Sequence, residues 1–248
     1  MKRIVYVLPI HNEEKILAAH VDRLTAYLER FAGARVLLVE NGSRDDSWRI
    51  AQELAQRTSP SPDAVSLIAL QEASAGIGYA YHRGLVEAIA TTDDLAGTWA
   101  VLTAADLPFG FSDLEAALIS MDRSSSRILM GSKAHAESSV AASPKRRIMS
   151  SIYRVARRAI VGMRVGDSQG SVFLRLDLAR DLLPKIASRN FFYSTELCYF
   201  AEQAGESIVE LPVVMDESEG AKRASTVRPF RDGTTMAKQL WHLRRRGE

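Results

Sequence analysis

Short apolar runs alternate with helical segments through the first half of the chain, and this alternation limits the fold more than any other feature. The runs Ile4–Ile10, Arg35–Val39 and Val65–Leu70 have the length and hydrophobic character of strands that are buried on both faces. Segments with apolar residues three and four positions apart, as in an amphipathic helix, separate them. Strands and helices in this order predict a doubly wound, mostly parallel central sheet with helices on both faces.

The next apolar run, Trp99–Phe109, contains a single acid, Asp106. We expect a buried strand that delivers Asp106 to its carboxyl end, which is where ligands bind in open parallel sheets. The first two strands also end in polar turns, His11–Glu14 and Glu40–Asp46. Asn12 is of a type that caps helices, so we expect it to cap the helix after the first strand.

Gly76 and Gly78 open the helix that is predicted after Val65–Leu70. Two glycines at that place would let a ligand approach backbone N–H groups at the positive end of a helix. The pair is not the dinucleotide-binding fingerprint, because Tyr81 fills the third position and the pair follows the third strand instead of the first.

Composition excludes several functional classes. The 248 residues carry a net charge of only +2, which argues against nucleic-acid binding. Cys198 is the only cysteine, and the five histidines lack metal-ligand spacing, so disulfides and zinc chemistry are not expected. The chain has neither a signal-peptide pattern at Met1-Lys2-Arg3 nor an apolar window of about 18 residues. We therefore expect a cytoplasmic protein, with any membrane contact peripheral.

Several motifs together resemble family 2 glycosyltransferases of the GT-A fold: Val7–Glu14, Val39–Asp45, Gly76–Gly78 and Thr103–Leu107. Later motifs are similar to the dolichyl-phosphate mannose synthase branch of that family: Gly131–Lys133, Lys145–Arg158, Asp167–Gln169, Tyr193–Leu197 and Ile208–Val213. The resemblance implies one GT-A domain over residues 1–232. A basic C-terminal helix over residues 233–248 would pack on that domain or on a membrane surface.

The resemblance implies inverting transfer of a hexose from a GDP- or UDP-linked donor to a polyprenyl phosphate or a small soluble acceptor. The nucleotide-binding residues that it implies are Pro9, Asn12, Glu13, Glu40, Asn41, Gly42, Gly76, Gly78 and Asp106. The catalytic residues that it implies are Asp106, Asp167, Gln169 and Glu196. Phosphate groups would be bound by Lys133, Arg146, Arg147 and Lys222.

This sequence departs from the family pattern at the metal site. The Asp-x-Asp motif is Ala104-Ala105-Asp106, the usual second aspartate of the nucleotide turn is Asn41, and a frequent glutamine is Pro108. Mg²⁺ can be held by one or two carboxylates together with substrate phosphates, so Asp106 stays a weak metal ligand and the use of Mg²⁺ or Mn²⁺ stays open. The losses favour an alternative function, in which a GT-A domain binds a nucleotide or a partner without transfer, or performs metal-independent nucleotide-sugar chemistry.

The segment Lys145–Arg158 predicts a basic amphipathic helix in the acceptor region. Its apolar residues share one face and its arginines another: Ile148, Ile152, Val155 and Ala159 against Arg147, Arg154 and Arg158. Such a helix suits packing against a protein core, and it equally suits an anionic membrane surface. Trp241, near the C-terminus, is a side chain that suits the same kind of interface.

Overall fold

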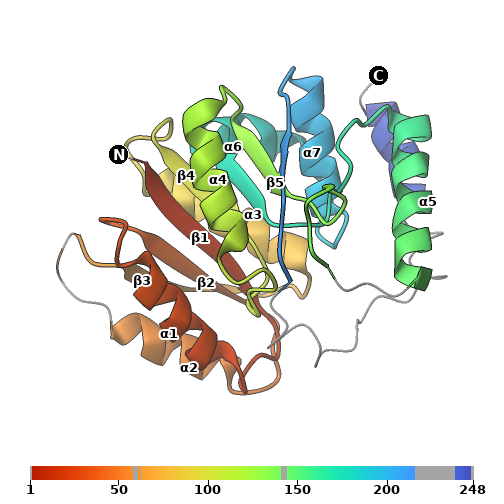
Figure 1. Cartoon of the computed structure of the whole chain (residues 1–248). Helices are drawn as coiled ribbons and strands as arrows, with labels where there is room; N and C mark the ends of the chain where they lie inside the picture. The colour runs from red at the N-terminus through yellow and green to blue at the C-terminus, as the bar shows by residue number, and fades with distance from the viewer. Residues whose placement is uncertain (1, 58–60, 62, 141–143, 216–237, 247–248) are drawn as a thin grey trace. The chain divides into compact units, whose positions relative to one another are not determined.

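The structure is a computed structural model that describes residues 2–57, 61, 63–140, 144–215 and 238–246 (Figure 1). The chain divides into two compact units. The first unit comprises Met1–Leu107 and Ser171–Tyr193, and the second comprises Pro108–Gly170 and Ser194–Glu248. Among the described residues, no helix combines the length and the apolar character needed to cross a membrane.

Five strands form the sheet of the first unit, in the order β3-β2-β1-β4-β6. Their bounds are β1 (Arg3–Ile10), β2 (Arg35–Asn41), β3 (Ser66–Glu72), β4 (Thr98–Leu102) and β6 (Val172–Arg175). The first four strands pair in parallel, and β6 runs antiparallel to β4. The central strands β1, β2 and β4 are buried along nearly their whole length, as their continuous apolar sequences predict.

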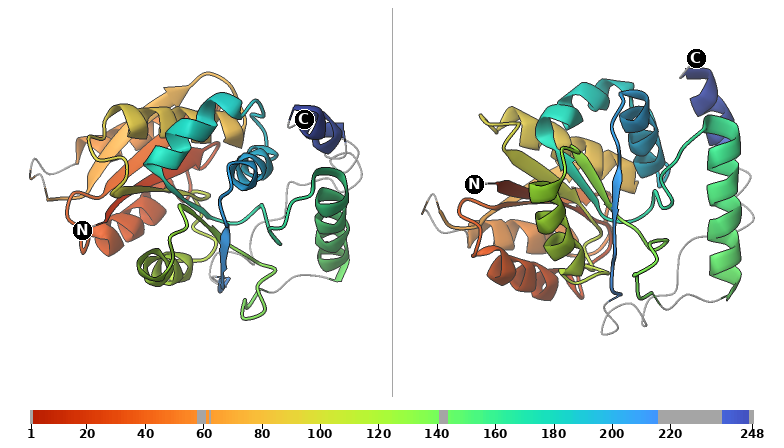
Figure 2. Two further views of the ribbon diagram at one scale, coloured as in Figure 1. Left: turned by 90° about the horizontal axis from the view of Figure 1, so that it is seen from above. Right: turned by 45° about the horizontal axis from the view of Figure 1, so that its top comes forward.

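Helices cover both faces of this sheet. Helices α1 (Leu17–Leu28) and α2 (Ser47–Gln56) lie on one face and α3 (Ile77–Ala90) lies on the other, beside α6 (Leu176–Leu182) and the short helix η1 (Leu183–Lys185) (Figures 1 and 2). A Cβ atom at Gly84 would lie 2.3 Å from Val7 Cγ1, so glycine lets α3 approach β1 closely. The predicted doubly wound, mostly parallel α/β fold is confirmed.

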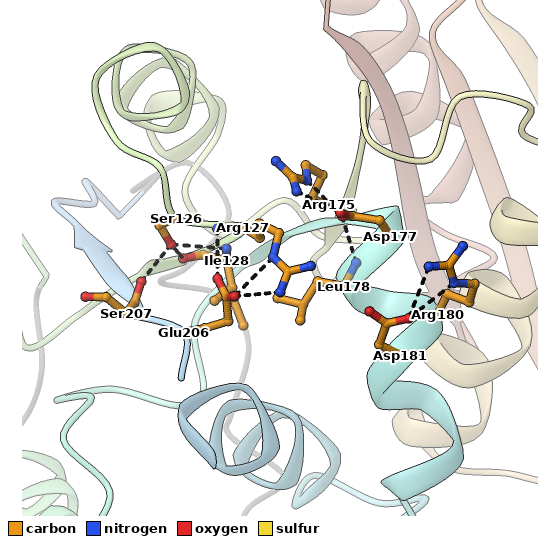
Figure 3. Close-up of polar contacts among 10 residues, drawn as sticks. All are labelled: Ser126, Arg127, Ile128, Arg175, Asp177, Leu178, Arg180, Asp181, Glu206 and Ser207. Carbon is orange, nitrogen blue, oxygen red and sulfur yellow. Dashed lines mark hydrogen bonds and ion pairs between the residues drawn. The ribbon is translucent and has the colours of Figure 1, made fainter. Parts of the chain in front are cut away.

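The second unit contains β5 (Ile128–Gly131) and β7 (Val209–Leu211), which pair in parallel. Its helices are α4 (Ser112–Arg123), α5 (Pro144–Val161), most of α7 (Tyr193–Gln203) and a C-terminal helix over residues 238–246. Glu206, just before β7, accepts hydrogen bonds from the Arg127 guanidinium at 2.7 and 3.0 Å (Figure 3). Ser126 Oγ donates to the Ser207 carbonyl at 2.7 Å, so both strands are fixed where they begin.

The strand expected over Trp99–Phe109 is shorter than the apolar run. β4 ends at Leu102, and the chain then turns, with the Leu107 N–H donating to the Ala104 carbonyl at 3.0 Å. Leu107 has a φ of +45°, which a strand does not accommodate. The Leu107 side chain is nevertheless buried, so the apolar sequence continues beyond β4. The end of the strand therefore cannot be located from hydrophobicity alone. Asp106 therefore lies in the turn after β4 and not at the last position of the strand.

Candidate active site

Asn12 ties the turn after β1 to the turn after β2. Its backbone N–H donates to Ser43 Oγ at 3.0 Å, and its side-chain Oδ1 accepts from the Arg44 N–H at 2.9 Å. The φ of Asn12 is +57°, a left-handed conformation that asparagine tolerates better than most residues. The expectation that Asn12 caps the following helix is wrong, because α1 begins at Leu17 with Ile16 at its N-cap.

Glu40 and Asn41 end β2 and are buried although both are polar, with 3% and 2% of their surface exposed. The Glu40 carboxylate accepts from the Ser43 backbone N–H and from Gln71 Nε2, the latter at 3.4 Å. Asn41 Oδ1 is a buried oxygen with no hydrogen-bond partner among the described residues. A buried acceptor left unpaired costs roughly 1–3 kcal/mol, and a ligand that donates a hydrogen bond there would remove this cost.

Asp106 lies in the turn that follows β4, the strand next to β1 in the sheet. Burial and the charge of Asp106 together raise the pKa of the Tyr81 phenol, which places the carboxylate near this α3 residue. His20 supports the turn from α1, since its Nδ1 lies 3.1 Å from the Ala105 carbonyl oxygen.

Backbone strain marks the same edge of the sheet. Within the described residues, Asn12 and Leu107 are the non-glycine residues with positive φ, and they follow β1 and β4. Conformations of this kind persist where the surrounding structure enforces them, and they cluster at functional sites. Gly42, at the end of β2, has a φ of +77°. The connections that follow three adjacent parallel strands thus each contain a residue with positive φ.

Gly76 and Gly78 make room for another part of the first unit. A Cβ atom at Gly78 would lie 2.5 Å from the Arg189 carbonyl carbon, and one at Gly76 would lie 2.7 Å from the Arg189 carbonyl oxygen. Arg189 Nη2 also lies 3.5 Å from His82 Nε2. The close approach that requires these glycines is therefore made by the Arg189 backbone, and their contact with a nucleotide stays a prediction.

In the second unit, Lys133 and the turn Asp167–Gln169 form one polar cluster. The Lys133 backbone N–H donates to Asp167 Oδ2 at 3.1 Å, and its Nζ lies 3.6 Å from the same oxygen. Lys133 Nζ also donates to the Gln169 carbonyl at 2.9 Å. The sequence predicted these three residues as site residues, and the structure brings them together.

Thr195 connects this cluster to the start of α7. Its Oγ1 accepts from Gln169 Nε2 at 3.1 Å and lies 2.9 Å from Ser168 Oγ. Glu196, the next residue, is fully buried, and its carboxylate pairs with the Arg246 guanidinium of the C-terminal helix. Arg246 is the third arginine of the run Arg244-Arg245-Arg246, and a buried carboxylate is its partner.

Two carboxylates that sequence reasoning missed hold the backbone of the neighbouring turn. Glu202 accepts from the N–H groups of Arg164 and Val165, at distances from 2.9 to 3.1 Å. Glu210 accepts from the N–H groups of Gly166 and Asp167, at 2.9 and 3.2 Å. The only signal for Glu210 in the sequence is a charged residue inside an otherwise apolar strand. Contacts with distant backbone groups leave no pattern in the sequence.

Some predicted residues are only partly described. Lys222 lies outside the described residues, and Arg146 belongs to α5 but its side chain is not described. Arg147 is exposed on α5. No group of three or more histidine, cysteine or acidic residues with metal-binding geometry occurs in the described part of the chain.

A family model described as glycosyl transferase family 2 matches residues 6–182. This match spans β1 to α6 and therefore includes the polar turns after β1, β2 and β4. The chain belongs to glycosyl transferase family 2. As a member of this family it is a glycosyltransferase that uses a nucleotide-sugar donor, which confirms the family and the enzyme class expected from its motifs. No curated protein was found to match it in sequence.

The chain is also similar to solved structures of glucosyl-3-phosphoglycerate synthase from Mycobacterium tuberculosis. The structure with UDP has a TM-score of 0.65 and 16% sequence identity, and the match covers 99% of this chain and 80% of that one. The structure with Mn²⁺, UDP-glucose and phosphoglyceric acid has a TM-score of 0.66 at the same identity and coverage. A third, with Mn²⁺, UDP-glucose and glycerol 3-phosphate, has a TM-score of 0.64, 16% identity and coverages of 98% and 78%. At this identity the likeness establishes a shared GT-A fold.

Proposed function

We propose that the protein transfers a hexose, with inversion, from a nucleoside diphosphate sugar to a phosphate-bearing acceptor. The observation that carries this proposal is the buried, unpaired Asn41 Oδ1 beside Glu40, at an edge of the sheet that also presents Asp106. Glu40 and Asn41 would accept hydrogen bonds from the base or ribose of the donor. Asp106 would be the carboxylate nearest the diphosphate. Pro9, Glu13, Gly42, Gly76 and Gly78 complete the proposed nucleotide site.

Asp106 is the acid that fits a divalent ion in the first unit. Mn²⁺ or Mg²⁺ would be held by Asp106 together with oxygens of the donor diphosphate, an arrangement with few protein ligands. The bound ion would supply positive charge to the departing diphosphate. The similar solved structures contain Mg²⁺ with UDP or Mn²⁺ with UDP-glucose, which supports this proposal.

The Lys133 cluster is the proposed acceptor site. A phosphate is already ionised at neutral pH and needs no strong general base, so Lys133 would bind its charge while Asp167 and Gln169 orient it. If the acceptor were a hydroxyl, Asp167 or Glu196 would have to serve as the base. Phosphoglyceric acid and glycerol 3-phosphate occur in the similar solved structures, which supports a small phosphorylated acceptor.

The exposed face of α5 favours a second acceptor, a polyprenyl phosphate. Ile148, Ile152 and Val155 are 60%, 58% and 67% exposed, and Arg147, Arg154 and Arg158 are exposed on the same helix. A helix that packs its apolar face on a protein core would bury these side chains. An apolar face flanked by arginines fits an anionic membrane surface, and this arrangement supports the dolichyl-phosphate mannose synthase-like branch and a cytoplasmic, peripherally attached enzyme.

Thermal unfolding in the presence of UDP, GDP and their sugar conjugates, with and without Mn²⁺, tests the donor site. A nucleotide that binds only the native state raises the unfolding midpoint. At a concentration a hundred times its Kd it adds about 2.7 kcal/mol to the free energy of unfolding. We expect one base to be selected and its sugar conjugate to yield product with either 3-phosphoglycerate or polyprenyl phosphate. Nucleotide binding without product from either acceptor would favour the alternative of a binding domain that has lost transfer.

Co-sedimentation with anionic vesicles separates the two acceptors. Near an anionic surface each arginine contributes about 1 kcal/mol, so changing Arg146, Arg147 and Arg154 to Gln should weaken vesicle binding by roughly two orders of magnitude. The change Arg180→Gln, at an exposed arginine of α6, is the matched control and should have little effect. A wild-type protein that ignores anionic vesicles at low salt and glycosylates a soluble phosphate would eliminate the lipid acceptor.

A further inference from the structure

Arg157 is a buried cation in a helix whose other described arginines are exposed. Only 2% of its surface is accessible, whereas Arg154 and Arg158 face solvent. Arg157 follows the exposed Ile148 by nine positions, which is two and a half helical turns, so the two side chains lie on opposite sides of α5. The helix therefore buries a charge and exposes apolar side chains. Burying a charge costs free energy unless neighbouring groups compensate for it, so the groups around Arg157 should show what this buried charge does.

The contacts of Arg157 point to the turn that carries Asp167. Its Nη2 donates to the Gly166 carbonyl at 2.9 Å, and its Cζ lies 5.2 Å from the centre of the Tyr153 ring. Nε and Nη1 are buried and have no hydrogen-bond partner among the described residues. The guanidinium thus forms one directed hydrogen bond in this cluster, and that bond holds the residue immediately before Asp167.

The same turn is held on its other side by carboxylates. Glu202 and Glu210 accept the four successive N–H groups of residues 164–167. Arg157 donates to the Gly166 carbonyl of the same segment. Negative side chains thus bind the N–H groups of the turn, and a positive side chain binds one of its carbonyls. A hydrogen bond to a charged group is about twice as strong as a neutral one, so three ionised side chains fix this turn tightly.

The charges of Arg157 and of the acids around the turn all act on the buried thiol of Cys198. Burial raises the pKa of its thiol, the positive charge of Arg157 opposes that rise, and the negative charges of Glu202, Asp167 and Glu210 add to it. The cation and the three acids therefore act on one buried atom. The positive charge of Arg157 offsets part of the repulsion among carboxylates that the turn brings together.

A second path runs from the same helix through Tyr153. The Tyr153 hydroxyl lies 3.0 Å from Thr195 Oγ1, the atom that also contacts Ser168 and Gln169. Arg157 packs against the Tyr153 ring one helical turn away. Two side chains on one face of α5 thus contact the turn. Arg157 binds it at Gly166, and Tyr153 is connected through Thr195 to Ser168 and Gln169.

We propose that Arg157 is a positioning residue for the acceptor side of the reaction. It fixes the turn over residues 164–169 from inside the second unit, so that the Asp167 carboxylate and the Gln169 carbonyl face Lys133. Its effect on turnover rests on the proposed function, whereas its hold on the turn does not. Because Arg157 offsets repulsion among the carboxylates around it, replacing it by an apolar side chain of similar length should lower overall stability, whereas Arg157→Lys keeps the positive charge and should lower it less.

Hydrogen exchange of the whole protein, followed by mass spectrometry, tests the hold on the turn. In Arg157→Met the amides of residues 164–167 should exchange about tenfold faster, because a hydrogen bond to a charged group is lost. Arg157→Lys keeps a cation that can reach the Gly166 carbonyl and should restore slow exchange. Arg123→Met, at an exposed arginine of α4 in the same unit, is the matched control and should exchange like the wild type.

Turnover of the same variants tests the positioning role. Arg157→Met should lower kcat about tenfold with the KM of the donor unchanged, and Arg157→Lys should recover most of the loss. A folded Arg157→Met protein with wild-type exchange and wild-type kcat overturns the inference. If the Met variant does not fold, Arg157→Lys decides, since fast exchange of residues 164–167 in that variant also overturns it. A wild type without turnover removes the proposed function, and the exchange result still decides whether Arg157 holds the turn.

Discussion

At the scale of single residues, Asn41 and Asp106 are the residues that we propose for the donor site of the first unit. Asn41 places an unpaired oxygen in a buried position at the end of β2, and Asp106 places a carboxylate in the turn after β4. Both residues stand where the family pattern has acids, and only one acid is kept. A site with one carboxylate binds a metal ion weakly by itself, so the donor diphosphate would have to supply the remaining oxygens.

Asp106→Asn should abolish transfer while the protein stays folded. The change keeps the shape of the side chain and removes its charge, and loss of a group that stabilises transition-state charge costs about a hundredfold or more in kcat. Initial rates and the unfolding midpoint are the two measurements. Asp93→Asn, at an exposed acid, is the control and should retain full activity. Undiminished turnover in a folded Asp106→Asn protein would remove Asp106 from the site.

Ala104→Asp should strengthen metal binding. It restores the first acid of the Asp-x-Asp pattern and adds a charged oxygen ligand near Asp106. Calorimetric titration with Mn²⁺, in the presence of the selected nucleoside diphosphate, should show an affinity about tenfold higher, equal to roughly 1.4 kcal/mol. An unchanged affinity would show that the turn does not present residue 104 to the metal.

The sequence predicted residues whose role follows from their place at a strand end, and it missed residues that act through the backbone. Glu40 was placed at the end of its strand because an apolar run ends in a polar turn there. Arg157, Glu202 and Glu210 bind main-chain groups of a turn, and such contacts depend on how the chain folds back and not on any local pattern. Asn12 was read as a cap because its side chain suits that role, yet its partners lie in the next turn.

At the scale of elements, the bounds of the β-strands were predicted better than which face of a helix is buried. Apolar runs located β1, β2 and β3 within two residues at each end, but the run through β4 continues into a buried turn. The periodicity of α5 was read correctly, whereas its orientation was not determined, because the same amphipathic pattern suits a protein core and a membrane surface. The structure exposes the apolar residues and buries an arginine instead.

The packing of α3 against the Arg189 segment makes stability depend on pH. Burial lowers the pKa of His82 and the nearby charge of Arg189 lowers it further, while Glu72 opposes them. A histidine with a lowered pKa in the folded state stabilises the fold above its unfolded pKa of about 6.5, and this contribution is lost as the pH falls below that value. The unfolding temperature should therefore decrease as the pH is lowered from 7.5 to 5.5. His82→Gln should flatten this fall, and His242→Gln, at an exposed histidine, should not.

At the scale of the whole molecule, the residues that we propose for the donor and those that we propose for the acceptor belong to different units. The first unit holds Glu40, Asn41 and Asp106, and the second holds Lys133 and the Asp167–Gln169 turn. Parallel strands with acids at their carboxyl ends favour a nucleotide site, and the Lys133 ammonium is the cation that would bind an acceptor phosphate. The single domain over residues 1–232 with a C-terminal helix over 233–248 stays a prediction. The α/β class and the family were predictable because many motifs occur in one order along the chain.

The most direct test of glycosyl transfer is proton NMR of the reaction product. The enzyme would be incubated with an α-linked nucleoside diphosphate hexose of the selected base, a phosphorylated acceptor and Mn²⁺. Inverting transfer predicts one equivalent of released nucleoside diphosphate for each β-linked sugar on the acceptor, and neither product with the Asp106→Asn variant. Free sugar without glycosylated acceptor, or a product that keeps the α configuration, would contradict it.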